Sequence, residues 1–139
     1  MRILLYYVGK PRDPHANRMA EEFIQRSTRY AKCEMREIVP ARFDPWAKHP
    51  SATKVLLDPA GKAMDSPQFA KLVSQAEQEA RDLVFLVAGA SGPPEAWRQN
   101  RAPLLSLSAM TMPHELARVV LAEQIYRAFT LLRGHPYPK

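Results

Sequence analysis

The sequence predicts an α/β protein with a mostly parallel sheet and helices on both faces. Two short stretches, Ile3–Val8 and Leu83–Val87, are almost entirely apolar, as is typical of strands buried on both faces. Segments with apolar residues at helical spacing alternate with the strand-like segments along the chain. The length of 139 residues suits one domain, so we expect residues 1–139 to form a single domain.

The first part of the chain reads as strand, helix and strand. After Ile3–Val8, side chains at helical spacing recur from Ala16 to Tyr30. Lys32–Val39 alternates between apolar and charged residues, which indicates a strand with one buried face. Pro40–His49 holds two prolines and shows no period, so we expect an irregular segment there.

The middle of the chain repeats this alternation. Val55–Asp58 indicates a short strand, and Pro59–Lys62 indicates a turn. Ser66 suits a helix cap and Pro67 suits the first helical position. The apolar face of this helix comprises Phe69, Leu72, Val73, Ala76 and Ala80.

The last part holds a short helix, a short strand and a long helix. We expect the short helix at Glu95–Asn100 and the strand at Leu104–Leu107. Pro113 suits the first position of the long helix, and Gly134 ends it. The buried stripe of this helix comprises Leu121, Ile125, Ala128, Phe129 and Leu132. Since ligands of parallel sheets bind at the carboxyl ends of strands, we expect a site in the loops after Leu57, Val87 and Leu107.

Composition and charge narrow the function classes. Apolar residues make up 46% and charged residues 24% of the chain, which is typical of a globular protein and excludes a disordered one. The net charge is +6, and residues 1–62 hold 12 Lys and Arg residues against 7 acidic ones. A basic N-terminal half suits a polyanion such as nucleic acid, and the alternative is a solvated basic surface.

Several kinds of site are not expected. Cys33 is the one cysteine, which excludes a disulfide scaffold and a Cys-rich zinc site. No ligand spacing indicates a metal, so we expect none. No apolar run approaches the roughly 18–20 residues that span a membrane. We therefore expect a protein of the cytoplasm with no membrane partner.

Two loops carry unusual composition. Val87–Gly92 is rich in small residues, which would let a ligand approach the backbone, although a plain turn has the same pattern. It matches neither G-x-G-x-x-G nor the phosphate loop. Ser106–His114 combines hydroxyls with methionines. Such a loop suits an adenine ring, and the alternative is a capped turn with core methionines.

The C-terminal part resembles a known family. The residues that carry the resemblance are Leu105–His114, Leu116–Val119, Ala122–Ala128 and His135–Tyr137, with similar order and spacing from Val8–Lys10 onward. Over essentially its whole length, the chain resembles the 23S ribosomal RNA pseudouridine N3-methyltransferases of the SPOUT superfamily.

The resemblance implies a fold, a reaction and partners. It implies a SPOUT-type α/β knot, with a trefoil knot near the C-terminus, and a homodimer. It implies transfer of a methyl group from S-adenosylmethionine to N3 of a pseudouridine in the large subunit of the assembled ribosome. The cofactor contacts that it implies are Leu57, Ala88, Gly89, Leu107, Ser108, Ala109, Met110, Thr111 and Met112.

The chain departs from the family pattern in four places. Ala88-Gly89 stands where the family has Gly-Gly, and Pro138 stands where the family has His. Ser91 stands where the family has an acidic or polar residue, and the segment from Pro40 to Lys54 is shorter than in the family. The departures at Ala88 and Pro138 favour the alternative of a catalytically impaired knotted dimer that binds RNA or cofactor. The intact Leu107–Met112 loop and Arg118 favour the enzyme.

Deprotonation of N3 calls for a base, and His is the usual choice. We expect His135 to act as the base, with Tyr137, in a tail that folds over the cofactor; the alternative is a plain terminus. Arg118 is expected on the RNA or cofactor side. His114 is a second candidate for contact with a ligand or RNA, whereas His15 and His49 are expected at the surface.

Other residues have structural interpretations. Glu123 and Arg127 have the spacing of an ion pair along a helix. Tyr126 and Leu116 lie off the main buried stripe and are candidates for a dimer interface. Trp97, Met110 and Met112 are expected in the core or in an interface.

Overall fold

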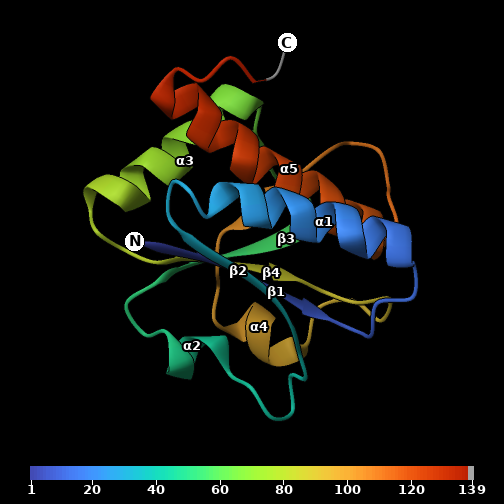
Figure 1. Cartoon of the computed structure of the whole chain (residues 1–139). Helices are drawn as coiled ribbons and strands as arrows, with labels where there is room; N and C mark the ends of the chain where they lie inside the picture. The colour runs from blue at the N-terminus through green and yellow to red at the C-terminus, as the bar shows by residue number, and fades with distance from the viewer. Residues whose placement is uncertain (138–139) are drawn as a thin grey trace.

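A computed structural model describes residues 1–137 of the chain. Its strands are β1 (Arg2–Val8), β2 (Lys32–Ile38), β3 (Thr53–Ala63), β4 (Leu83–Val87) and β5 (Leu104–Ser106). Its helices are α1 (Pro14–Ser27), α2 (Pro45–Lys48), α3 (Ser66–Gln78), α4 (Glu95–Gln99) and α5 (His114–Arg133) (Figure 1). The alternation of strands and helices predicted from the sequence is confirmed.

The strands form one parallel sheet. Among residues 1–137, five strands pair in the order β2-β1-β4-β3-β5, and every neighbouring pair is parallel. β1 lies between β2 and β4, and the residues of β4 are all buried. A strand with neighbours on both sides and helices on both faces has no exposed side, which explains the continuous apolar runs.

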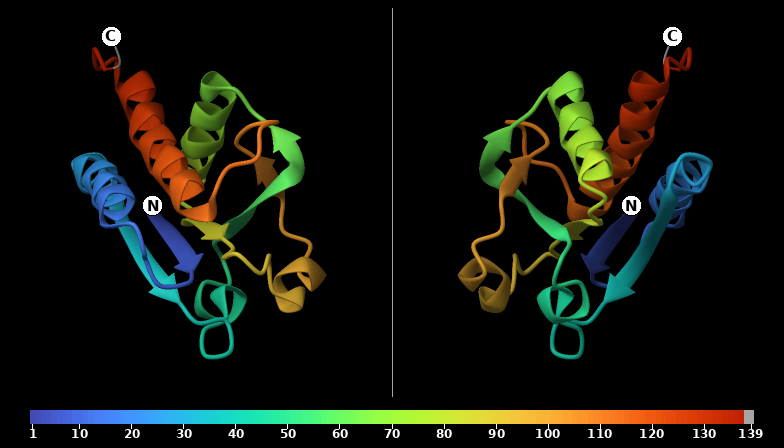
Figure 2. Two further views of the ribbon diagram at one scale, coloured as in Figure 1. Left: turned by 90° about the vertical axis from the view of Figure 1, so that its right-hand side faces the viewer. Right: turned by 90° about the vertical axis from the view of Figure 1, so that its left-hand side faces the viewer.

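Helices cover both faces of the sheet, as predicted. Figure 2 shows α1, α3 and α5 on one face and the short helices α2 and α4 on the other. Alternate side chains of β1 enter the two cores: Ile3 and Leu5 pack on the side of the long helices, whereas Leu4 and Tyr6 pack with Trp97 of α4. The two-residue period of the strand thus divides one apolar run between two layers.

The starts of two helices differ from the prediction. Asp65, and not Ser66, caps α3: its carboxylate accepts from the Gln68 backbone N–H, and the Gln68 side chain accepts from the Asp65 N–H. A reciprocal capping box satisfies two free donors at once, which a single Ser hydroxyl does not. Pro113 precedes α5 as its cap, with ψ at 147°, and the helix begins at His114.

The segment predicted as irregular contains the short helix α2. Asp44 begins it by accepting from the Trp46 N–H. The helix covers the core on the α4 side of the sheet, where the centroids of the Phe43 and Tyr6 rings lie 4.9 Å apart. His49 is buried at 7% exposure and hydrogen-bonds the Tyr6 hydroxyl at 2.8 Å, so the prediction of a surface histidine is wrong.

β3 continues through the segment predicted as a turn. It pairs with β5 at Leu57, shifts register, and pairs again at Lys62. The four intervening residues bulge from the strand. Gly61 touches the β5 backbone there: a Cβ at this position would lie 2.5 Å from the Leu104 carbonyl carbon. Only glycine permits this approach, so the second pairing depends on Gly61.

Within residues 1–137, no helix has the length and apolar character needed to cross a membrane. The same part of the chain holds no group of three or more His, Cys, Asp or Glu side chains placed to hold a metal. The knot implied by the resemblance stays a prediction.

Candidate functional site

A pocket opens at the carboxyl ends of β3, β4 and β5. Its volume is about 380 Å³, which lies within the roughly 300–1,000 Å³ typical of small-molecule sites. Its walls come from the bulge in β3, from the ends of β4 and β5 with the loops that follow them, and from the first residues of α5. The lining residues are 57–59, 87–90, 92–93, 105–108, 110–114 and 117. The site expected after Leu57, Val87 and Leu107 is therefore one continuous cavity.

The β3 wall is the bulge between the two pairings with β5. Leu57 and Asp58 line the pocket. The Asp58 carboxylate accepts from the Ala60 backbone N–H at 2.8 Å, which closes a local turn. Because the strand pairs with β5 on both sides of the bulge, this wall is anchored at both ends.

The β4 wall is the small-residue loop. Ala88 and Gly89 both line the pocket, and the Gly92 N–H donates to the Gly89 carbonyl at 3.0 Å. A Cβ on Gly89 would lie 3.0 Å from the Val8 carbonyl oxygen at the end of β1.

The β5–α5 loop forms the third wall and is held by its own hydroxyls. Ser106 Oγ donates to the Ser108 carbonyl at 3.0 Å, and Ser108 Oγ accepts from the Met110 N–H at 2.9 Å. Among the predicted cofactor contacts, Leu107, Ser108, Met110, Thr111 and Met112 line the pocket.

Ala109, Met110 and Trp97 lie in different environments. Ala109 belongs to the β5–α5 loop but is not among the residues that line the cavity, and its contact with the cofactor stays a prediction. Met110 is 80% exposed and Trp97 is 3% exposed, so only the tryptophan is a core residue. The composition of the loop could not distinguish a methionine at the cavity mouth from one in the core.

The start of α5 closes the pocket. His114 and Ala117 line it. Glu115 turns away: its Oε1 accepts from the backbone N–H groups of Arg12 and Asp13 at 2.8 and 3.2 Å. These two hydrogen bonds lower the pKa of the Glu115 carboxyl. The β1–α1 loop is thereby attached to the first turn of α5.

Arg118 lies behind this wall and does not line the cavity. It is 2% exposed, and its guanidinium carbon lies 3.8 Å from the centroid of the Tyr7 ring. Its Nη2 lies 3.6 Å from Glu115 Oε1, while Nε and Nη2 make no hydrogen bond within residues 1–137. In this conformation Arg118 supports the start of α5, instead of contacting a ligand directly as expected.

The predicted tail residues lie at the other end of α5. This helix has 20 residues and therefore a length of about 30 Å. His135 and Tyr137 follow its last turn and do not line the pocket, and that the tail folds over the cofactor stays a prediction. Pro138 lies outside the described residues.

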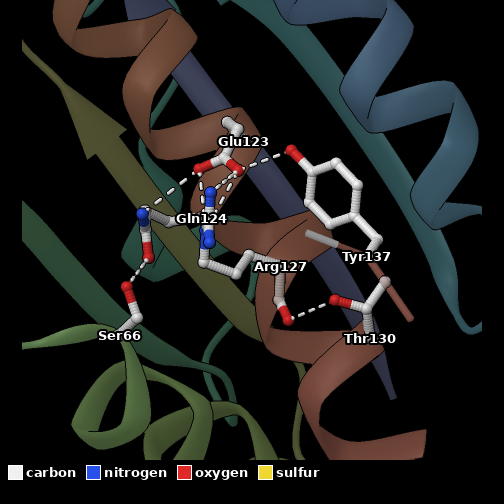
Figure 3. Close-up of polar contacts among 6 residues, drawn as sticks. All are labelled: Ser66, Glu123, Gln124, Arg127, Thr130 and Tyr137. Atoms are coloured by element: carbon white, nitrogen blue, oxygen red, sulfur yellow. Dashed lines mark hydrogen bonds and ion pairs between the residues drawn. The ribbon is translucent and has the colours of Figure 1, made fainter. Parts of the chain in front are cut away.

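Figure 3 shows how the tail is held. The Tyr137 hydroxyl donates to Glu123 Oε2 at 2.7 Å, and the same oxygen accepts from Arg127 Nη2 at 2.7 Å, which confirms the predicted ion pair. Burial and the Glu123 carboxylate raise the pKa of Tyr137 to about 12. Tyr126, proposed for an interface, is 6% exposed and meets the Tyr137 ring at 4.8 Å between centroids.

The fold and the pocket define a parallel α/β protein with a cavity of small-molecule size at the carboxyl edge of its sheet. The family described as "Predicted SPOUT methyltransferase" matches residues 1–138, and the chain belongs to this family.

Known relatives agree with this assignment. A protein of Solibacter usitatus (strain Ellin6076), named ribosomal RNA large subunit methyltransferase H, is 62% identical over 137 residues, which cover 99% of each chain. A protein of the same name from Thermus thermophilus is 38% identical over 143 residues and covers 99% of this chain and 98% of its own. A solved structure of a probable methylase family protein from Haemophilus influenzae Rd KW20 shares the fold, with a TM-score of 0.56 at 10% identity, over 99% of this chain and 70% of that one.

Proposed function

We propose that this protein transfers a methyl group from S-adenosylmethionine to N3 of a pseudouridine in 23S ribosomal RNA, in the cytoplasm and on the assembled ribosome. The observation that carries the proposal is the pocket closed by Leu105–Pro113, the part of the sequence that most resembles the family. The full-length similarity to relatives named for methylation of large-subunit ribosomal RNA supports it.

The residues of the pocket fit this cofactor. Leu57, Val87 and Leu105 provide apolar surface for an adenine ring, and Gly89 adds a stretch of backbone without a side chain to the pocket wall. Hydroxyls at Ser108 and Thr111, together with the Asp58 carboxylate, provide polar groups for a ribose and an amino acid moiety. We assign the cofactor contacts to these residues and to Ala88, Leu107, Met110 and Met112.

For this reaction the protein mainly has to align the methyl donor with the acceptor and to remove the N3 proton. When bound, S-adenosylmethionine supplies a methyl group that is already activated on a sulfonium. The loops around the pocket hold donor and acceptor in line and exclude water. His114, the histidine on the pocket wall, is placed to accept the N3 proton at an imidazole nitrogen. We therefore prefer His114 over His135 as the base contributed by the same subunit.

We propose a homodimer in which the tail of one subunit reaches the pocket of the other. His135 and Tyr137 follow the last turn of α5 and do not line the pocket of their own chain, so we assign them to the pocket of a second copy. Leu116 at 49% exposure and Met110 at 80% leave apolar surface beside the pocket for such a partner. Arg118 then serves the site by holding the start of α5.

Calorimetry and a methyl-transfer assay test this function. The protein should bind one S-adenosylmethionine per pocket and transfer its methyl group to purified large subunits that lack the modification. His114→Ala should lower turnover by about 10²–10⁴-fold while cofactor binding is kept. Loss of turnover only in His135→Ala would instead assign the base to the tail.

The second candidate function is a binding protein without turnover, which Ala88 favours because its methyl group occupies pocket space. Cofactor binding without methyl transfer in the parent protein would establish this candidate. Absence of cofactor binding would refute the methyltransferase and leave a binding protein that holds RNA alone.

A further inference from the structure

The β1–α1 loop, residues 9–13, lies at the mouth of the pocket. Two contacts fix it there. At its start, the Val8 carbonyl oxygen touches Gly89 of the pocket wall, where an added Cβ would lie 3.0 Å away. At its end, the backbone N–H groups of Arg12 and Asp13 donate to Glu115, the neighbour of the pocket residue His114. In Figure 1 this loop and the beginning of α5 lie on the same side of the molecule.

The loop presents two exposed cations, Lys10 and Arg12. Neither side chain takes part in an ion pair within residues 1–137. Both charges therefore remain available at the pocket mouth. Other exposed arginines, such as Arg18, Arg29 and Arg36, also take part in no ion pair within the described residues, so it is their place beside the pocket that distinguishes Lys10 and Arg12.

The neighbouring acids are already engaged. Glu115 accepts two backbone N–H groups and lies 3.6 Å from the Arg118 guanidinium. Asp13 accepts from the N–H groups of His15 and Ala16 as the cap of α1. The first turns of α1 and α5 both lie here, and their dipoles add positive potential. The mouth of the pocket therefore favours an anion.

We propose that Lys10 and Arg12 bind phosphates of the substrate RNA backbone beside the methyl-donor pocket. This proposal rests on the proposed function, which places an RNA base at the pocket. A base that enters the pocket brings its flanking phosphates to the rim, and long exposed cations on an anchored loop suit these phosphates. The side chains contact phosphate and not the base edge, so they position the RNA without reading its sequence.

The experiment compares two double variants that remove equal charge. Lys10→Gln with Arg12→Gln removes the proposed contacts, while the backbone N–H of Arg12 still reaches Glu115. Lys32→Gln with Lys71→Gln is the control. Lys32 begins β2 at the opposite edge of the sheet and Lys71 is exposed on α3. Binding to purified large ribosomal subunits is measured from about 50 to 200 mM salt, the range over which phosphate contacts dominate the change in affinity.

The expected result is a change in salt dependence. Each lost phosphate contact lowers the slope of log affinity against log salt by about 0.9, or about 0.7 for single strands. The Lys10/Arg12 variant should therefore have a slope smaller by about 1.4–1.8 than the parent, and the control variant should keep the parent slope. In steady-state assays, KM for the subunits should rise while kcat stays near the parent value.

Equal slopes for the two double variants would overturn the proposal. Calorimetry with S-adenosylmethionine separates this failure from a failure of the proposed function. If the parent binds no cofactor or transfers no methyl group, the proposed function fails, and the difference in salt slope still decides whether Lys10 and Arg12 bind RNA. A Lys10/Arg12 variant that loses cofactor affinity would also refute the proposal, because the loop would then serve the pocket itself.

Discussion

Arg118 stacks on Tyr7, with the guanidinium carbon 3.8 Å from the centroid of the ring. The two residues join α5 to β1 directly behind the pocket. Because Arg118 is 2% exposed, water screens this contact very little.

The contact between Arg118 and Tyr7 should contribute to stability. We expect a double-mutant cycle with Arg118→Met and Tyr7→Leu to give a coupling energy of about 1–2 kcal/mol, the range for a desolvated cation–π pair. Urea unfolding of the four proteins measures it. Strictly additive losses would mean that the stacking carries no energy of its own.

Filling the pocket should block the cofactor without unfolding the protein. Ala88 lines the cavity and is half-buried, so the ring of Ala88→Phe has space only in the pocket. We expect no measurable binding of S-adenosylmethionine by calorimetry and a Tm close to that of the parent. Ala109→Phe is the matched control, because Ala109 does not line the cavity. Equal binding by both variants would place the cofactor elsewhere.

Gly61→Ala should destabilise the edge of the sheet. Its Cβ would lie 2.5 Å from the Leu104 carbonyl carbon and 2.7 Å from the Leu105 nitrogen, and backbone atoms cannot move aside cheaply. We expect a loss of about 1–3 kcal/mol in the free energy of unfolding, as for overpacked sites. Denaturant titration measures the loss, and the exposed neighbour Ala60→Ser should be silent. A Gly61→Ala protein as stable as the parent would show that the second β3–β5 pairing adjusts freely.

The pH dependence of stability should include a contribution from His49. Burial, followed by the charge of Arg2, lowers the pKa of His49 below its ordinary value of 6.5. Between the folded and unfolded pKa values the unfolded chain binds more protons, so stability is lost as pH falls from about 6.5 through the folded value.

The variant His49→Gln tests this contribution. It should be more destabilising at about pH 7.5 than at about pH 5, because the histidine's contribution is already reduced in acid. Thermal unfolding of both proteins at the two pH values measures the difference. The same loss at both pH values would show that protonation of His49 does not affect folding.

The sequence predicted the elements whose signal is local. The apolar runs of β1 and β4 and the stripe of α5 gave strands and a helix in the right order, because burial on both faces or on one helical stripe leaves a regular pattern. The positions of the three pocket loops followed from the parallel sheet. The individual cofactor contacts came from the resemblance to the family, and they remain predictions.

What the sequence did not predict depends on contacts between distant segments. The burial of His49 requires the Tyr6 hydroxyl 43 residues away, and the extension of β3 requires the β5 backbone. The separation of the tail from the pocket follows from the straight length of α5. In the sequence, His114 comes directly after a proline at the predicted start of a helix. This pattern alone does not indicate that the first turn of the helix faces a cavity.

The place of β1 inside the sheet, between β2 and β4, sets the order in which the chain can fold. Its neighbour β4 follows more than seventy residues later, and the Arg2 backbone N–H donates to Asp82, 80 positions along the chain. Pairings so distant in sequence slow folding, since a long loop must close before they form. A nascent chain that ends before Leu83 has β2 to pair with β1 but nothing on the other edge. During synthesis, the most apolar strand of the N-terminal half therefore stays open to other chains until β4 arrives.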